Sequence, residues 1–337
     1  ALSRNDGIGH RRPNWNSTRL PNDELVRLNR CGLMLRSGFG ARTAKSVSST
    51  SAGKQSISDH GKGADSVIRA IAGSDLAVWL DADDITGVAT DGLLSTWTAK
   101  AGIAPAQSTA DNQPNYQPAG LNNRPAVQFD SSRKDFLYWV NGGLNASDQP
   151  ENTIILVSNS AANDEWQIIF ELGNPNHWQN NDGLGQWYSN TNLFYHSIGS
   201  GDATKDSYEY STKEICGTGT DLSNVLISSY NRNGATPSST VVPSINAFIN
   251  SEPITVAGSP APAYDAGDAT NSAWSSESAH LGARVSGVPS GGTPSYPLDG
   301  ALREFIVLNR ETTAGEAFRL GRALMAKSGI TRLLSNY

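Results

Sequence analysis

Two glutamates flank a short apolar segment in the middle of the chain, and a pair of carboxylates is what a glycosidase needs to cleave its substrate. Glu165 and Glu171 bracket the segment WQIIF. Because side chains alternate along a strand, a separation of six places both carboxylates on one face, some distance apart. We interpret them as charges that face solvent at the two ends of a strand. The pattern predicts that the protein is not an enzyme, and a divergent glycosidase is kept as an alternative.

Other catalytic arrangements are not found in the sequence. It has no G-x-S-x-G segment, no H-E-x-x-H segment and no Walker loop. Cys31 and Cys216 are too few for a disulfide framework or a zinc site, and we interpret them as unpaired thiols. The five histidines are scattered, at positions 10, 60, 177, 196 and 280. Nucleophilic and zinc chemistry are therefore not predicted.

An acidic cluster offers oxygen ligands of the kind that Ca²⁺ prefers. Its members are Asp81, Asp83 and Asp84. Asp81 and Asp83 alternate suitably, but the spacing is not that of an EF-hand loop. The alternative is that the segment is only a strand end and a turn. We predict no cofactor, and these three carboxylates are the candidate ligands if a calcium ion binds.

A stretch rich in aromatic and amide side chains, residues 177–196, is the candidate ligand-binding region. Sugars bind by stacking on aromatic rings and by hydrogen bonds from their hydroxyl groups to amides. The alternative is that some of these rings point inward and belong to the core. The candidate glycan-binding residues are Trp178, Trp187, Tyr188 and Tyr195.

Charge is distributed unevenly along the chain. Residues 1–70 hold twelve basic and five acidic residues, a balance of +7, which leaves −13 for the remainder of a chain whose net charge is −6. A basic arm is attracted to anionic surfaces. It contains few aromatics, so we favour docking on a protein partner over binding to nucleic acid. The predicted docking residues are Arg4, Arg11, Arg12, Arg19, Arg27, Arg30, Arg36 and Arg42.

Short runs of β-branched and aromatic residues follow one another from about residue 74. Gly, Pro, Asn and Asp clusters separate them, which is typical of an antiparallel sandwich. About ten strands are too many for one flat sheet, so we expect two packed sheets. No apolar run is long enough to span a membrane. The predicted strands are 76–81, 124–130, 136–140, 153–158, 166–172, 192–197, 225–231, 245–250, 279–283 and 301–309.

One long helix is predicted near the C-terminal end. Thr313 and Glu316 form a capping-box pattern, and Gly329 is a suitable C-terminal stop. A short helix is also expected over residues 66–72, capped by Asp65. The buried stripe of the long helix is predicted to contain Ala317, Leu320, Gly321 and Leu324.

Two parts of the chain resemble LamG-like, concanavalin A-like jelly-roll domains. LDGALREFIVLNRETTAGEAFRLGRALMAKSGI, at 298–330, is similar to the closing strand and terminal helix of such domains. The resemblance implies an all-β, two-sheet antiparallel jelly-roll sandwich with a C-terminal helix. It also implies that Trp79 and Trp97 fill the sandwich core. The opening of such a domain is similar to LAVWLDADDITGV at 76–88, LSTWTAKAG at 94–102 and QSTADNQPNYQPAGLNNRPAVQFD at 107–130.

The resemblance specifies function poorly, because the superfamily includes lectins, glycosidases, adhesion modules and virion surface proteins. We predict a basic anchoring arm at 1–73 and a LamG-like domain at 74–337. The predicted function is that of a non-enzymatic bacteriophage structural protein. Its arm docks on capsid or tail proteins and its jelly-roll projects from the virion surface as a decoration or fibre domain. Homo-oligomers and glycan contacts are also expected. The main alternative is a secreted, extracellular bacterial carbohydrate-binding or adhesion module.

Overall fold

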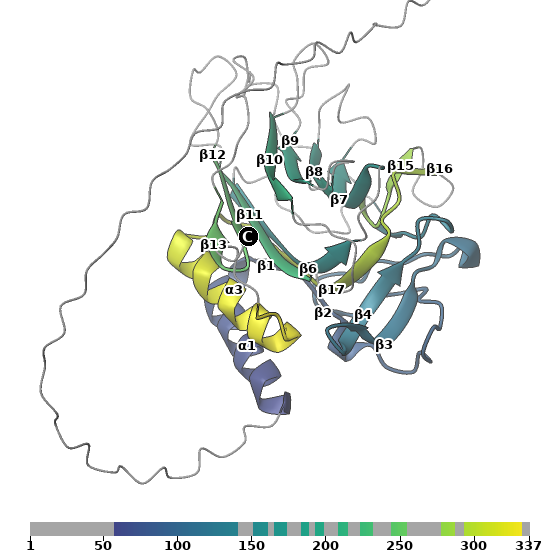
Figure 1. Ribbon diagram of the computed structural model, residues 1–337, viewed down its shortest axis with the longest axis horizontal. Helices are drawn as coiled ribbons and strands as arrows, with labels where there is room; N and C mark the ends of the chain where they lie inside the picture. Colours follow the sequence, from purple (N-terminus) through teal and green to yellow (C-terminus); the bar gives the residue numbers. More distant parts are fainter. Residues whose placement is uncertain are drawn as a thin grey trace, which may run out of the picture. The chain divides into compact units, whose positions relative to one another are not determined.

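The computed structural model of the protein contains two facing antiparallel β-sheets and two helices that lie against the first sheet (Figure 1). The fold is therefore the predicted all-β sandwich. None of the helices in the described residues is long and apolar enough to cross a membrane. The structure describes residues 57–140, 151–160, 165–173, 183–188, 193–198, 208–214, 223–231, 244–254, 278–286 and 293–331.

The first sheet contains nine strands in the described residues. They are β1 (Leu76–Asp81), β2 (Ala99–Ala101), β3 (Asn115–Leu121), β4 (Arg124–Phe129), β6 (Glu151–Ser160), β11 (Asn224–Asn231), β12 (Ser244–Ile249), β13 (Glu252–Pro253) and β17 (Gly300–Leu308). Their order is β13-β12-β11-β6-β17-β1-β2, with β4 paired to both β17 and β3. Every residue of β17 is buried, as expected for a central strand covered on both faces.

The second sheet contains six strands in the described residues. They are β5 (Leu137–Trp139), β7 (Gln167–Gly173), β8 (Gly183–Tyr188), β9 (Leu193–Ile198), β10 (Tyr208–Glu214) and β14 (Ala279–Leu281), in the order β10-β9-β8-β7-β14-β5. A two-stranded ribbon, β15 (Arg284–Ser286) and β16 (Thr293–Ser295), follows β14. Gly282 joins β14 to β15 at φ +89°, and a Cβ there would lie 2.2 Å from the ring of Phe129. Only glycine fits this turn without strain.

The core between the two sheets is built from large apolar side chains on both inner faces. The ring of Phe305 in β17 lies 4.9 Å from that of Phe170 in β7 and 5.6 Å from that of Trp139 in β5. Burying each such side chain stabilises the fold by about 1.5–3 kcal/mol. These contacts hold the second sheet in place and thereby position its outer face.

Two helices cover the opposite face of the first sheet: α1 (Ile57–Ala72) and α3 (Ala314–Ser328). Ile68 of α1 and Leu320 of α3 pack in one apolar cluster with Trp79 and Ile306 of the sheet. α3 begins at a complete capping box between Thr313 and Glu316 and ends at Gly329, which has φ +68°. The layers therefore run from helices to first sheet to second sheet.

The structure confirms the ten predicted strands, the C-terminal helix, its two ends and its buried stripe. The prediction missed β2, β3, β8, β10, β13, β15 and β16. Trp97 lies in the core between the sheets as expected. The expectation for Trp79 is wrong, because Val78 and Leu80 occupy the inner face and alternation turns Trp79 toward the helices.

The helix expected over 66–72 begins at residue 57, and Asp65 lies inside it instead of capping it. α1 precedes the division proposed at residue 73, yet its Ile68 and Ile71 belong to the same apolar cluster as α3. Residues 1–56 lie outside the described residues, so the anchoring arm and the eight arginines assigned to it stay predictions.

Candidate functional site

A row of polar side chains crosses the outer face of the second sheet. His280 of β14 pairs in register with Tyr138 of β5 on one side and with Glu171 of β7 on the other. Their neighbours along the strands, such as Leu281 and Leu172, belong to the core between the sheets. Because side chains alternate, the three polar residues point away from that core. We call Tyr138, Glu171, His280 and Arg284 the polar row.

Arg284 of β15 joins the polar row through an ion pair. Its Nε donates to both carboxylate oxygens of Glu171, at 3.1 and 3.3 Å. Its guanidinium carbon lies 5.4 Å from the centre of the Tyr296 ring. Glu171 is only 1% exposed and Arg284 7%. The charged pair is therefore held between a strand and an aromatic ring, largely out of water.

His280 is buried, and the pKa of its imidazole is far below the usual value. Burial lowers its pKa to about 4, although the charge of Glu171 acts in the opposite direction. The imidazole is therefore neutral near pH 7. Its Nε2 atom is buried without a hydrogen-bond partner in the described part of the chain. Its ring lies 6.5 Å from that of Phe136, which packs with Ala283 and Val285 in a small apolar cluster.

The polar row thus combines a carboxylate, a guanidinium, a neutral imidazole and nearby aromatic rings. The carboxylate accepts hydrogen bonds, the guanidinium donates them, and a neutral imidazole does both. Sugar hydroxyl groups need such partners, and the apolar faces of sugar rings stack on aromatic side chains. The arrangement is suited to recognising a polar ring-shaped ligand.

The predicted aromatic residues are placed only in part. Trp187 and Tyr188 lie in β8, and Tyr195 lies in β9 directly opposite Trp187. β8 pairs with β7, so this segment belongs to the same sheet as Glu171. The side chains of these three residues, and the whole of Trp178, lie outside the described part of the structure. Their assignment to a glycan site stays a prediction.

Sequence reasoning interpreted Glu171 as a solvent-facing charge, and the structure shows that this is wrong. Glu171 is buried because Arg284 pairs with it, whereas Glu165 is exposed as expected. Tyr138, His280 and Arg284 were missed. A polar residue between two apolar ones in a short strand, as in Ala279-His280-Leu281, is the one signal that points to an outer-face position.

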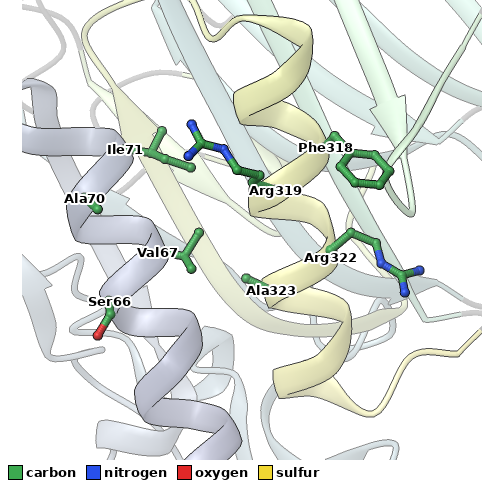
Figure 2. Close-up of a pocket in the computed structure, with 8 residues that line it drawn as sticks. All are labelled: Ser66, Val67, Ala70, Ile71, Phe318, Arg319, Arg322 and Ala323. Carbon is green, nitrogen blue, oxygen red and sulfur yellow. The ribbon is translucent and has the colours of Figure 1, made fainter.

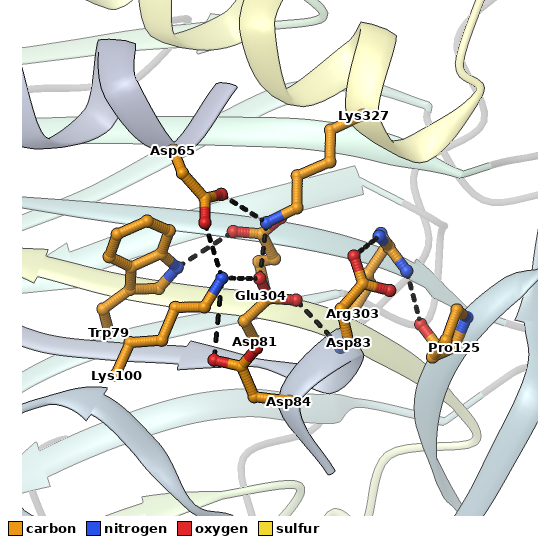
Figure 3. Close-up of polar contacts among 10 residues, drawn as sticks. All are labelled: Asp65, Trp79, Asp81, Asp83, Asp84, Lys100, Pro125, Arg303, Glu304 and Lys327. Atoms are coloured by element: carbon orange, nitrogen blue, oxygen red, sulfur yellow. Dashed lines mark hydrogen bonds and ion pairs between the residues drawn. The ribbon is translucent and has the colours of Figure 1, made fainter. Parts of the chain in front are cut away.

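Asp81, one of the predicted calcium ligands, belongs to a second polar cluster, between the first sheet and the helices, and Asp83 and Asp84 lie beside this cluster (Figure 3). Lys327 of α3 lies 2.5 Å from Asp81, 2.9 Å from Asp65 and 2.9 Å from Glu304. Lys100 of β2 lies 2.5 Å from Asp81 and 2.8 Å from Asp65. We call Asp65, Asp81, Lys100, Glu304 and Lys327 the lysine cluster.

All three predicted calcium ligands face cations of the protein itself. Asp81 contacts both lysines, Asp83 lies 2.5 Å from Arg303, and Asp84 lies 3.6 Å from Lys100. Among the described residues, no group of three or more His, Cys, Asp or Glu side chains is arranged to hold a metal ion. A calcium ion at these carboxylates stays a prediction. Asp81 joins the first sheet to α3 through Lys327, whereas Asp83 and Asp84 pair with Arg303 of β17 and Lys100 of β2.

Electrostatics in the lysine cluster follow from its burial. Burial, and then the charge of Asp81, raise the pKa of Glu304 to about 7. Burial also acts to raise the pKa of Asp81, but the two lysines outweigh it, and that pKa is lowered. The pKa of Lys327 is raised, because Glu304 and Asp81 outweigh the effect of its burial. Asp81 and Lys327 are therefore an ion pair at neutral pH.

A shallow groove of about 510 Å³ lies between α1 and α3, on the side away from the first sheet (Figure 2). Val67 and Ile71 of α1 face Ala323 and Arg319 of α3 across it, and Phe318 also lines it. Phe318 is 53% exposed. The lining of the groove is mostly apolar, with Ser66, Arg319 and Arg322 as its polar members, and we assign the ligand site to the polar row instead.

Comparison with known proteins gives only remote structural likenesses. No protein-family model matches the chain, and no curated protein matches it. A mutant NanB sialidase from Streptococcus pneumoniae is 15% identical, with a TM-score of 0.41, over 57% of this chain and 27% of the sialidase. The matched region therefore spans about a quarter of that protein.

Two further solved structures show likenesses of the same order. The CBM40 domain of the Ruminococcus gnavus IT-sialidase, bound to α2,3 sialyllactose, is 14% identical with a TM-score of 0.38, over 51% of this chain and 83% of that domain. A Trypanosoma rangeli sialidase is 9% identical with a TM-score of 0.46, over 81% of this chain and 39% of the sialidase. Likenesses this remote carry no conclusion about function.

Proposed function

We propose that the protein is a non-enzymatic carbohydrate-binding module, and that its ligand site is the polar row on the outer face of the second sheet. The observation that carries this proposal is the buried Glu171–Arg284 pair beside neutral His280. Glu171 and His280 point away from the core between the sheets, and Arg284 pairs with Glu171 on that side.

Burial of these polar groups needs an explanation. Removing a charged pair from water is unfavourable, and apolar side chains of the same size often stabilise a fold as well or better. A buried nitrogen without a hydrogen bond adds about 1–3 kcal/mol of further cost. Strongly perturbed pKa values cluster at functional sites for this reason. A ligand that offers a hydrogen bond to Nε2 of His280 would offset this cost.

Carbohydrate is the ligand class that fits the row best. Its hydroxyl groups donate to Glu171 and accept from Arg284, and its ring stacks on a tyrosine such as Tyr138 or Tyr296. Trp187 and Tyr195, which lie opposite each other in β8 and β9, extend the proposed site along the same sheet. The ion pair with Arg284 supports a role for Glu171 in binding over a role in bond cleavage.

The test is a glycan array probed with the full chain, followed by calorimetric titration of the glycans that bind. Glu171→Gln and Arg284→Lys are expected to weaken binding at least tenfold. The first removes the negative charge of the pair, and the second keeps the positive charge but loses the planar guanidinium and its fixed donors. Arg319→Ala, on the helix face far from the second sheet, is the matched control and keeps full affinity. Unchanged affinity in both polar-row variants rules out this site, and an array without any hit rules out the function.

The charge distribution favours a second candidate, a virion structural role with the basic arm as its anchor. The arm carries +7 over residues 1–70, against −13 for the remainder. Such an arm is attracted to an anionic capsid or tail surface, or to the body of another copy. Limited proteolysis of the purified chain tests this idea. Removal of the arm up to about residue 57, with α1 retained, supports it, and an arm that resists cleavage in the isolated chain contradicts it.

A further inference from the structure

Three side chains of the lysine cluster are arranged for a covalent reaction. Lys327 Nζ lies 2.5 Å from Asp81 Oδ2 and 2.9 Å from Glu304 Oε1. Asp81 and Glu304 are cross-strand neighbours in β1 and β17, and Lys327 reaches them from α3 (Figure 3). Both carboxylates are fully buried, and the Lys327 side chain is 2% exposed. The amino group of Lys327 and the carboxyl groups of Asp81 and Glu304 therefore lie in contact in a buried site.

We propose that Lys327 and Asp81 join in an isopeptide bond, with Glu304 as the group that transfers protons between them. Glu304 takes a proton from the Lys327 ammonium and passes it to the Asp81 carboxylate. The neutral amine then attacks Cγ of Asp81, so that a C–N bond forms. One C–O bond of Asp81 breaks, and its oxygen leaves as water with two of the ammonium protons. Glu304 ends in its initial state, and no oxidant or other reactant is needed.

The surroundings of the three groups favour the product. In water the separated ions are strongly hydrated, but here burial removes that hydration from both of them. An amide replaces two buried charges with one neutral group. Trp79 Nε1 donates to Glu304 Oε2 at 3.1 Å, which fixes the carboxyl group with Oε1 toward Lys327. A pKa of about 7 lets Glu304 both accept and release a proton near neutral pH.

Lys100 also contacts Asp81, at 2.5 Å, but it has a different role in the proposed reaction. Its other partners are Asp65 and Asp84, and its side chain is 12% exposed. Among the described residues, its ion pairs are with Asp65, Asp81 and Asp84, whereas Lys327 also pairs with Glu304. The Lys100 ammonium lies against Oδ2 of Asp81, where negative charge develops during the attack. A fixed cation at that point stabilises the tetrahedral intermediate.

The intact mass of the full chain, measured after denaturation, tests the proposal. We expect a mass lower by one water molecule than the sequence predicts. Proteolysis should then yield one branched peptide that joins the Asp81 segment to the Lys327 segment. A mass equal to that of the linear chain overturns the proposal, and so does a branch that starts at Lys100. Glycan binding is a separate property, so this result leaves the proposed function untouched.

Two variants test the roles of the individual groups. Lys327→Arg keeps a cation but has no amine that can form the bond, and we expect the linear mass. Glu304→Gln keeps the shape and the acceptor for Trp79 but cannot take the proton, and we again expect the linear mass. Loss of water in Glu304→Gln overturns the assigned role of Glu304. If circular dichroism shows that either variant does not fold, the mass of the unmodified chain still shows whether the isopeptide bond forms. Arg319→Ala is the control and should lose one water as the unmodified chain does.

Discussion

The two outer faces of the sandwich both bury charged groups, but they do so in different surroundings. On the first sheet, the lysine cluster lies beneath α1 and α3, and its partners come from both helices and from β1, β2 and β17. On the second sheet, Glu171 pairs with Arg284 of the following ribbon, beside a histidine nitrogen that has no hydrogen-bond partner within the described residues. The first set of charges connects the helices to the first sheet, whereas the Glu171–Arg284 pair connects the second sheet to the ribbon that follows it. We assign structure to the first face and propose ligand binding for the second.

The largest expected effect of a single change is at Lys327. Lys327→Ala removes both the charge of this side chain and the bond proposed for it, and it leaves Asp81 and Glu304 buried without Lys327. The removal of one partner from a buried ion pair alone destabilises a fold by about 3–5 kcal/mol. Chemical denaturation measures the change. Arg322→Ala, on the exposed side of the same helix, should change stability by less than about 0.5 kcal/mol. Equal effects of the two variants contradict the structural role of the lysine cluster.

The two faces are also expected to respond to pH in opposite directions. The pKa of His280 is lowered from 6.5 to about 4, so the unfolded chain binds the proton more readily. Its contribution to stability is therefore present above pH 6.5 and is lost as the pH falls toward 4. The pKa of Glu304 is raised from 4.5 to about 7, so the folded chain binds the proton more readily. Its ionisation weakens the fold above pH 7, and that penalty disappears as the pH falls toward 4.5.

Unfolding free energies measured from pH 4 to pH 8 separate these two contributions. Each amounts to at most about 3 kcal/mol, from shifts of about 2.5 pKa units. His280→Gln should remove the loss of stability below pH 6.5, and Glu304→Gln should remove the gain below pH 7. If both variants keep the pH profile of the unmodified protein, neither group titrates as the structure indicates.

The smallest expected effect concerns the aromatic residues of β8 and β9. Trp187→Ala and Tyr195→Ala are each expected to weaken glycan binding about tenfold, or about 1.4 kcal/mol, through loss of ring stacking. Calorimetric titration with a glycan identified on the array measures the change. A comparable loss of affinity from Phe318→Ala would indicate that the ligand binds in the groove between the helices and not at the polar row.

Local patterns in the sequence predicted most of the fold. Alternation identified strands such as β6 and β17, and the residues Thr313, Glu316 and Gly329 set the ends of α3. Strands with little alternation were missed, such as β3, whose NYQPAGL contains Pro and Gly. The helix α1 was predicted too short because its first residues lack a clear apolar stripe.

The sites were much less predictable, because their members come from distant parts of the chain. Glu171 and Arg284 are 113 residues apart, and Asp81 and Lys327 are 246 residues apart. The carboxylates at 81, 83 and 84 looked like metal ligands because their cationic partners cannot be found from one sequence. Glu171 was interpreted as exposed for the same reason. Spacing shows what a residue can do, and the fold determines which partner it meets.

The most direct test of the central claim is hydrogen–deuterium exchange of the full chain with and without a glycan identified on the array. Ligand binding at the polar row predicts slower exchange in β5, β7 and β14 and in the ribbon of β15 and β16. Exchange in α1 and α3 should not change. Protection confined to the two helices, with no change in the second sheet, would contradict the assignment of the binding site.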